Sequence, residues 1–294
     1  MSILVIGGTG TVGSEVVARL LEAGVDTRVL VRSPNKAKSL PAGAKTVAGN
    51  LEDIASLSAA MQGAEGVFMI TPLGPLETVM GITAVRAAQQ ASVRRMVYLS
   101  VFHAEDGRHI PHFGSKIPVE IAVQESGIAS TILRPNEFFQ NDRSLKQAIT
   151  EYGVYPFPAG DIGVNRVDVR DIAEAAVNAL TQSGYEGKTY PLVGPEAFTG
   201  KRVAEVYSRL LGRPVRYGGN DLDAWAEQAK QIMPMEMVED LRIMFEHFHK
   251  EGMLASGEDH KLRDEILGHA PRRFEDFAGE LVASWTSAAD KQAS

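Results

Sequence analysis

The stretch ILVIGGTGTVGSEVVARLLEAG near the amino terminus constrains the fold more than any other part of the chain. Gly8, Gly10 and Gly13 fit the spacing G-x-G-x-x-G between an apolar run and a helical pattern. Glycine here permits a tight turn and lets the backbone approach a pyrophosphate, whose charge meets free N–H groups at the helix start. The loop predicts a dinucleotide site with candidate contacts at Gly7, Gly8, Thr9, Gly10, Thr11, Val12 and Gly13. A purely structural glycine turn is the alternative, and a P-loop is excluded because no Lys-Ser/Thr pair follows.

Short apolar runs alternate with helical patterns through the first 135 residues. The runs that predict buried strands cover 3–6, 27–31, 45–48, 66–71, 95–100 and 130–134. Helices are expected between them, for example over 14–24 and 76–91, where apolar residues recur at helical spacing. Strands that alternate with helices pair in parallel through right-handed crossovers. The pattern therefore predicts an α/β fold with a Rossmann-type, doubly wound parallel sheet.

The regular alternation ends after Pro135, where an aromatic and turn-rich segment follows. Residues 165–180 then supply one more strand-to-helix unit, with Asp171 as the expected N-cap, and 188–193 supply one more strand. Beyond these segments the pattern is mostly helical. We therefore expect an NAD(P)-binding Rossmann-like domain over 1–150, rejoined by 165–193, and a smaller, mostly helical C-terminal cap formed by 151–164 and 194–294.

Composition narrows the class of protein further. The 294 residues carry a formal net charge of -7 and include no cysteine. The negative net charge argues against a nucleic-acid partner, since clustered Lys and Arg side chains provide most of the binding to a phosphate backbone. The lack of cysteine excludes disulfides and thiolate chemistry, and no apolar run approaches the roughly 20 residues that span a bilayer. We expect a cytoplasmic protein with no membrane partner and, because no histidines stand at ligand spacing, no metal.

The end of the second expected strand indicates which dinucleotide binds. NAD enzymes place an acidic residue there, where it accepts hydrogen bonds from the ribose hydroxyls. Here the strand ends VLVRSPNKAK, so Arg32 stands in that position and Ser33 and Lys36 follow it. A guanidinium matches a 2′-phosphate in charge and in forked geometry. NADP(H) is therefore favoured over NAD(H), and a solvated loop arginine is the alternative.

Four motifs together carry a family resemblance: GGTGTVG at the first turn, RSP after the second strand, AGNLED after the third and TILRPNEFFQN at the sixth. With them the chain resembles the NmrA-like branch of the atypical short-chain dehydrogenases. Within that branch it is similar to the NAD(P)H-dependent reductases that act on quinones, azo compounds and triphenylmethane dyes. The resemblance is specific through about residue 195, and it implies a Rossmann fold and reductase activity.

The resemblance also implies roles for residues beyond the glycine loop. Asn50 and Leu51 would lie near the adenine, where the Asn50 amide oxygen can accept a hydrogen bond in place of the aspartate that is common in the family. Thr71 and Pro72 would line the cofactor channel, and Ser100 stands where ordinary short-chain dehydrogenases keep a catalytic serine. The remaining candidates are Pro135 and Asn136 at the nicotinamide end, and Phe138 and Phe139 in the wall of a substrate pocket. For the two phenylalanines, core packing is an equal alternative.

The segment HIPHFGSKIPVE stands where ordinary short-chain dehydrogenases carry Tyr-x-x-x-Lys. His112 takes the tyrosine register and Lys116 the lysine register, which makes them candidates for proton transfer and for holding the nicotinamide ribose. Pro118 disfavours helical backbone at the residue before it, so we expect a helix that begins between Gly114 and Pro118. Ser115 would be its cap and Lys116 its first residue. A surface role for His112 is the alternative.

These observations favour an NADPH-dependent reductase that transfers hydride to a small, flat, electrophilic aromatic substrate such as a quinone, an azo compound or a triphenylmethane dye. The candidate catalytic residues are Ser100, His112 and Lys116. The missing tyrosine keeps a second function open, a non-catalytic redox sensor of the NmrA type that binds NADP(H) and acts through a protein partner. A nucleotide-sugar epimerase, which needs the tyrosine, is least favoured. A homodimer is compatible with the sequence.

Overall fold

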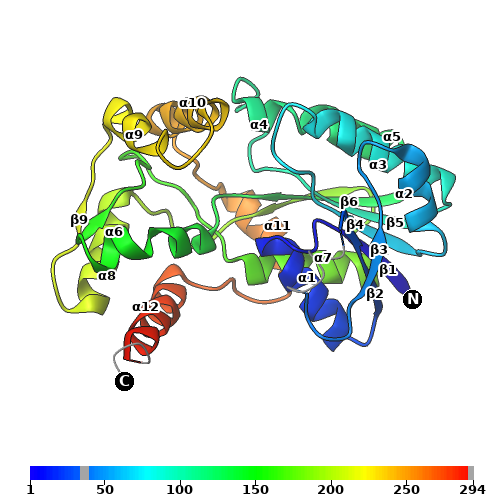
Figure 1. The fold of residues 1–294 in the computed structure, drawn as a ribbon, viewed down its shortest axis with the longest axis horizontal. Helices are drawn as coiled ribbons and strands as arrows, with labels where there is room; N and C mark the ends of the chain where they lie inside the picture. Colours follow the sequence, from blue (N-terminus) through cyan, green and yellow to red (C-terminus); the bar gives the residue numbers. More distant parts are fainter. Residues whose placement is uncertain (34–39, 291–294) are drawn as a thin grey trace. The chain divides into compact units, whose positions relative to one another are not determined.

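The structure is a computed structural model that describes residues 1–33 and 40–290, with side chains described up to Thr286. The main sheet of the described residues has seven parallel strands (Figure 1). The strands are β1 (Ser2–Ile6), β2 (Asp26–Val31), β3 (Lys45–Ala48), β4 (Gly66–Met69), β5 (Arg95–Leu99), β6 (Ala129–Pro135) and β8 (Lys188–Leu192). All six runs expected to be strands in the first 135 residues form strands, which confirms the α/β fold class.

The order of strands across the sheet is β3-β2-β1-β4-β5-β6-β8. The chain therefore builds outward from β1 in one direction and from β4 in the other. Val5 of β1 pairs in parallel register with Val29 of β2 on one side and with Phe68 of β4 on the other. In doubly wound sheets, ligands bind outside the carboxyl ends of the strands where the order reverses. The topology places that position next to the glycine loop.

Helices cover both faces of this sheet. On one face α1 (Thr11–Glu22) packs against α7 (Val169–Thr181) (Figure 1). On the other face α3 (Glu77–Gln90) lies between α2 (Ile54–Met61) and α5 (Ile117–Glu125). Among the described residues, no helix is both long enough and apolar enough to cross a membrane.

Alternate residues of the central strands build the core beneath α2, α3 and α5. Parallel strands covered on both faces read as continuous apolar runs, because each side chain meets a helix on one face or the other. The strand residues in this core are Leu4, Ile6, Val67, Met69, Met96, Tyr98 and Ile132. The helix residues that cover them include Leu57, Met61, Ala84, Ala88, Val119 and Val123. This packing fixes the strands whose carboxyl ends carry the candidate site.

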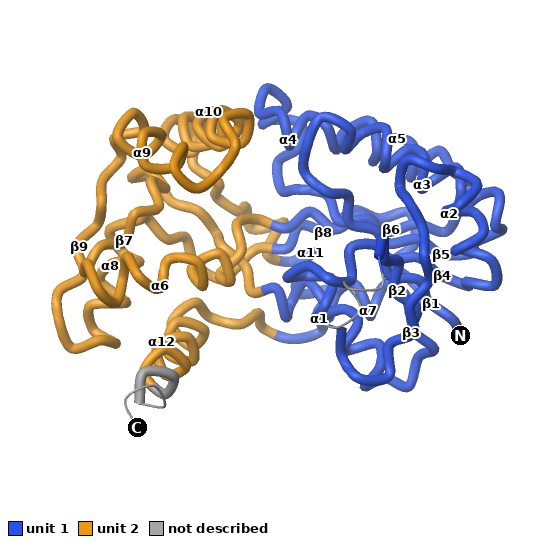
Figure 2. Tube along the Cα trace, in the orientation of Figure 1, with its two compact units in different colours: residues 1–135, 169–192, 261–269 blue, residues 136–168, 193–260, 270–294 orange. Residues whose placement is uncertain are grey.

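The chain divides into two compact units (Figure 2). Unit 1 comprises residues 1–135, 169–192 and 261–269 and contains the seven-stranded sheet. Unit 2 comprises residues 136–168, 193–260 and 270–294. These units describe how the chain packs, and the domain boundary near residue 150 that the sequence suggests stays a prediction.

Unit 2 is mostly helical. Its helices are the 3-10 helix η2 (Phe139–Leu145), α6 (Lys146–Thr150), α8 (Gly200–Leu211), α9 (Leu222–Ala229), α10 (Met235–Glu251) and α12 (Phe274–Asp290), and α11 (Gly257–Leu267) begins in it. The short strands β7 (Val154–Tyr155) and β9 (Arg216–Tyr217) form a separate two-stranded sheet. The apolar core of unit 2 draws on η2, α8 and α12, and its members include Phe139, Tyr207, Phe274, Phe277 and Trp285.

A charged network lies inside that core. The Arg166 guanidinium bonds both carboxylate oxygens of Asp142, with its Nη2 atom 2.8 Å from Oδ1, and both side chains are buried. The hydroxyl of Tyr207 donates to the same carboxylate at 2.8 Å, and that of Tyr155 donates at 3.3 Å. Phe274 lies under the guanidinium, 5.0 Å from its central carbon to the ring centroid. The network joins η2 to α8 and α12 through one buried ion pair.

The start of α7 differs from the sequence-based expectation. Helix α7 begins at Val169, so Asp171 lies in its first helical turn and is not the N-cap. Among the described residues, no strand leads directly into the helix from 165–168, and Val167 forms only an isolated bridge with Phe138. The backbone around Val167 pairs with the segment after β6 instead of entering the sheet, because the Val167 N–H donates to the Glu137 carbonyl.

Candidate functional site

The glycines after β1 are needed for different reasons. Gly7 has φ +83°, a left-handed conformation that L side chains rarely adopt. A Cβ on Gly13 would lie 2.2 Å from the Gly7 carbonyl oxygen, and a Cβ on Gly8 would lie 2.6 Å from Val29 Cγ1. A Cβ on Gly10 would meet nothing closer than the Gly7 oxygen at 3.4 Å. Packing therefore requires Gly8 and Gly13, whereas the protein itself has room for a side chain at Gly10.

Helix α1 begins directly after this loop with an open amino terminus. Gly10 is its N-cap and offers no side-chain oxygen, and the described residues of the first turn include no acidic side chain. Helix α2, by contrast, is capped by Asp53, whose carboxylate accepts the N–H groups of Ala55 and Ser56. The first N–H groups of a helix have no partner within it, and its dipole favours an anion there. The loop and the start of α1 fit the pyrophosphate of a dinucleotide.

The residues expected to select the dinucleotide follow β2 and β3. Arg32 and Ser33 are exposed at the carboxyl end of β2, and Lys36 lies outside the described residues. Asn50 is exposed two residues after β3, and its side-chain oxygen accepts the Glu52 N–H at 3.2 Å. Leu51 beside it is half-buried. The parallel sheet brings these positions to the same edge as the glycine loop, which supports their assignment to the cofactor. That assignment stays a prediction.

A buried carboxylate that sequence reasoning missed stands at the same edge. Thr71 follows β4, is buried, and donates its hydroxyl to Glu77 Oε1 at 2.8 Å. Lys116 forms an ion pair with the same oxygen, and the Ser115 hydroxyl donates to Glu77 Oε2 at 2.8 Å. Glu77 thus joins two residues expected to contact the cofactor, Thr71 and Lys116. The sequence shows Glu77 only as an acidic residue in the first turn of a helix, where a solvated position is usual.

The segment around His112 folds as two short helical pieces. Helix α4 (Pro111–Gly114) begins at a proline, which suits the first helical position, and α5 begins at Ile117 with Lys116 as its N-cap. The expectation that Ser115 caps the helix is therefore wrong: Ser115 is the C-cap of α4. Pro118 has no N–H to donate, so the helix breaks where the sequence indicates, but the turn before the break still forms.

The backbone of both residues at this break is right-handed helical, with φ and ψ of −63° and −24° at Ser115 and −81° and −28° at Lys116. His112 and Lys116 therefore lie about one helical turn apart. The His112 ring is half-buried and meets the Phe113 ring edge-on, with centroids 4.8 Å apart. The fold thus retains the spacing of the Tyr-x-x-x-Lys pair with an imidazole in the first position.

Ser100 follows β5 and is buried. Its N–H donates to the Leu133 carbonyl, but its hydroxyl has no hydrogen-bond partner among the described residues. Buried hydroxyls normally have a partner. The orphaned hydroxyl at the carboxyl edge of the sheet keeps Ser100 a candidate for contact with the nicotinamide or the substrate.

The remaining candidates stand at the end of β6 and just beyond it. Pro135 is the last residue of β6, and its carbonyl accepts the Phe102 N–H. The Asn136 side chain is used within unit 2, where it donates to the Met253 carbonyl at 2.9 Å and accepts the Glu137 N–H. Phe138 is half-buried, whereas Phe139 is fully buried among Phe274 and Phe277. Packing in the apolar core therefore accounts for the position of Phe139, and no contact with a substrate is needed to explain it.

Comparison with known proteins identifies the family. A model of the NmrA-like family matches residues 1–278. The chain belongs to the NmrA-like family. Among its relatives, an NAD(P)H azoreductase from Xenophilus azovorans is 42% identical over 250 residues, which cover 81% of this chain and 83% of that protein. The family resemblance expected from the four motifs is therefore confirmed.

Solved structures extend this family relationship to the fold. The quinone oxidoreductase QOR2 of Escherichia coli, in complex with NADPH, matches with a TM-score of 0.85 and 26% identity over 95% of this chain and 99% of that one. The triphenylmethane reductase of Citrobacter sp., in complex with NADP(H), matches with a TM-score of 0.83 and 25% identity over the same shares of the two chains. A quinone reductase and a triphenylmethane reductase thus share the fold of this chain along nearly its whole length.

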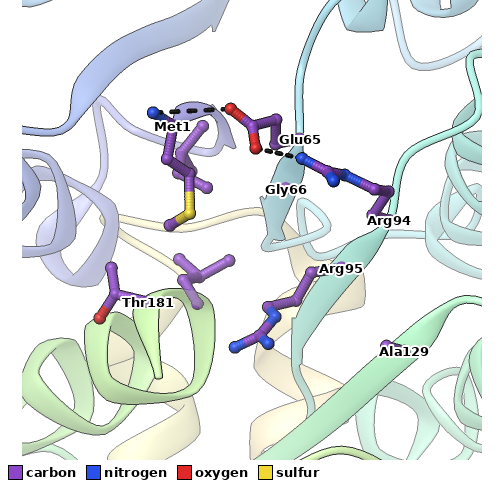
Figure 3. A pocket seen from close by; sticks show the side chains of 9 residues that line it. Met1, Glu65, Gly66, Arg94, Arg95, Ala129 and Thr181 are labelled. Atoms are coloured by element: carbon purple, nitrogen blue, oxygen red, sulfur yellow. Dashed lines mark hydrogen bonds and ion pairs between the residues drawn. The ribbon is translucent and has the colours of Figure 1, made fainter. Parts of the chain in front are cut away.

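A cavity of about 280 Å³ lies at the opposite edge of the sheet in unit 1, where the strands begin (Figure 3). Its charged side chains already have partners. Glu65 pairs with the Met1 ammonium at 3.5 Å and with Arg94, and Arg95 pairs with Glu186 at 2.8 Å. Dinucleotides bind at the carboxyl ends of the strands, so this cavity is not the cofactor site.

Proposed function

We propose that the protein binds NADPH at the carboxyl edge of its seven-stranded sheet and passes the hydride to a quinone, an azo compound or a triphenylmethane dye. The open start of α1 behind Gly10 carries this proposal, because it offers free N–H groups and space where a pyrophosphate fits. The relatives establish the general activity: the protein is an oxidoreductase that binds a nicotinamide cofactor. Our proposal goes further in two respects: NADPH is the preferred cofactor, and the hydride acceptor belongs to one of these three classes.

Three groups in unit 1 hold the cofactor in this account. The N–H groups at the start of α1 bind the pyrophosphate, Arg32 binds the 2′-phosphate, and Lys116 binds the nicotinamide ribose. When bound, NADPH supplies the hydride. The protein contributes by positioning the acceptor, because a flat acceptor held against the nicotinamide at near-attack distance reacts without a covalent intermediate.

His112 is the proposed proton donor for acceptors that need one. It takes the register of the missing tyrosine and lies about one turn before Lys116. Hydride adds to one azo nitrogen while the electron pair of the N=N bond moves to the other nitrogen, which must take a proton. An imidazole suits that proton transfer near neutral pH. The central carbon of a cationic triphenylmethane dye accepts hydride without a proton. The lack of tyrosine is therefore compatible with these acceptors.

The choice of cofactor is tested at Arg32. We expect the protein to bind NADPH about tenfold more tightly than NADH, which is about 1.4 kcal/mol, because the guanidinium pairs with the 2′-phosphate. Arg32→Asp should erase or invert that preference in calorimetric titrations with both cofactors. Arg94→Asp, which makes the same charge change at an exposed arginine on the opposite edge of the sheet, should leave the preference unchanged. Equal affinity of the unaltered protein for the two cofactors would refute the assignment.

The acceptor class is tested by following loss of nicotinamide absorbance with a panel of quinones, azo compounds and triphenylmethane dyes. We expect oxidation of NADPH with members of this panel. His112→Ala should slow azo reduction by about 10²-fold, the lower end of the usual range for general acid catalysis, and dye reduction far less. His109→Ala, which removes an exposed histidine of the same segment, is the control and should alter neither rate.

The missing tyrosine also supports the second function, a sensor that binds NADP(H) and regulates a protein partner. The same panel separates the two. Tight NADPH binding with no turnover of any acceptor would favour the sensor, and isolation of protein partners would then be the next experiment.

A further inference from the structure

Glu77 is a buried carboxylate for which the proposed function has assigned no role. Its side chain is 0% exposed, and that of Lys116 is 9% exposed. Three side chains from two segments donate to it: Thr71 after β4, and Ser115 and Lys116 at the junction of α4 and α5. Burying a carboxylate is costly unless charge and hydrogen bonds compensate it. Together the three donors compensate the buried charge of Glu77.

The start of α3 holds the α4–α5 junction at more than one point. Glu77 receives the side chains of Ser115 and Lys116, and the neighbouring Thr78 hydroxyl donates to the Ser115 carbonyl at 2.7 Å. Thr71 ties the same carboxylate to the end of β4. The Lys116 ammonium is thereby fixed relative to the carboxyl edge of the sheet. An ammonium has three N–H donors, and the bond to Glu77 uses one of them.

We propose that Glu77 is the positioning residue for Lys116: its carboxylate keeps the buried ammonium charged and directs the remaining N–H donors toward the nicotinamide ribose. This inference rests on the proposed cofactor site, because Lys116 is its contact with the ribose. Without Glu77, a buried amine loses its countercharge and gives up its proton more readily as the pH rises. The neutral amine then holds the ribose less well.

Other ionisable groups stand on the elements packed around Lys116. Tyr98 of β5 is buried, which raises its pKa well above the usual value, and the charges of Glu77 and Glu120 raise it further. On α5 and β6, Glu120 pairs with Arg134, which also pairs with Glu105. His112 lies on α4. Because all these groups remain in a Glu77 variant, comparison with the unaltered protein at each pH isolates the effect of the lost carboxylate.

The test measures NADPH affinity by fluorescence between pH 7 and pH 9.5 in four variants. Glu77→Gln keeps the shape of the side chain and removes its charge. Its affinity should match that of the unaltered protein near pH 7 and fall about tenfold below it by pH 9.5. The double variant Glu77→Gln/Lys116→Arg should lose this slope, because a guanidinium stays charged over the whole range. Glu120→Gln, which removes a buried carboxylate paired with Arg134, should show no slope.

The fourth variant, Lys116→Ala, separates this inference from the proposed function. It should bind NADPH more weakly at every pH, and normal binding would refute the role of Lys116 at the ribose. If Lys116→Ala is impaired but Glu77→Gln shows either no loss or an equal loss at every pH, the positioning role of Glu77 is wrong. Only a pH-dependent loss that arginine rescues supports it.

Discussion

Gly10→Val is expected to weaken NADPH binding by about 100-fold or more, which is about 2.7 kcal/mol, while the protein stays folded. The Gly10 backbone has φ −88° and ψ 176°, an extended conformation open to any residue. Its Cβ would have the Gly7 carbonyl oxygen at 3.4 Å as its nearest neighbour. We therefore expect the added side chain to meet the pyrophosphate and not the protein. Fluorescence titration measures the binding, and thermal unfolding measures the fold.

Gly13→Ala is the matched comparison for that result. A Cβ at Gly13 would lie 2.2 Å from the Gly7 carbonyl oxygen, so the loop or the start of α1 must shift. We expect this smaller substitution to lower the melting temperature, which Gly10→Val should leave nearly unchanged. Normal NADPH binding by Gly10→Val would show that the glycine loop is structural only.

The second large effect concerns stability. Asp142→Asn should lower the free energy of unfolding by about 3–5 kcal/mol, because it leaves the Arg166 charge buried without its countercharge. The Asp142 side chain is 1% exposed and that of Arg166 is 3% exposed, so water cannot replace the lost carboxylate. Tyr155 and Tyr207 lose the same charged acceptor. Urea unfolding followed by circular dichroism measures the change.

An exposed ion pair provides the control for this prediction. Asp26 and Lys45 lie 2.6 Å apart, with side chains 44% and 67% exposed. Solvent screens such pairs, so Asp26→Asn should lower the free energy of unfolding far less than Asp142→Asn does. Similar losses for Asp142→Asn and Asp26→Asn would mean that the buried network contributes little to unit 2.

The fold of unit 1 was predictable because its signals are local. An apolar run, a glycine loop and an amphipathic helix each depend on neighbouring residues, and their alternation dictates a parallel sheet. The start of α7 was not, because the backbone of Val167 pairs with Glu137, 30 positions earlier in the chain. Pro118 correctly indicated a helix break, but the turn of α4 before it depends on Pro111 at a first helical position.

Within the candidate site, too, the sequence reveals residues that belong to a local pattern and does not reveal those that depend on contacts with distant residues. The glycine loop carries its own spacing, so its residues could be named in advance. Glu77 could not, because the Lys116 and Ser115 side chains that bury it lie 39 and 38 residues away. An aromatic pattern also cannot separate a pocket wall from a core. Phe139 packs against Phe274 and Phe277, which come from the far end of the chain.

Transfer of a labelled hydride tests the central claim most directly. The protein is given NADPH that carries deuterium at the transferable position of nicotinamide C4, together with a cationic triphenylmethane dye in ordinary water. A direct transfer forms a carbon–deuterium bond at the central carbon of the dye as the cofactor is oxidised. Mass spectrometry of the colourless product should then show one added deuterium, and at a limiting NADPH concentration Gly10→Val should slow its formation in proportion to the weakened binding. Bound NADPH with no labelled product, across dyes of this class, would contradict the account.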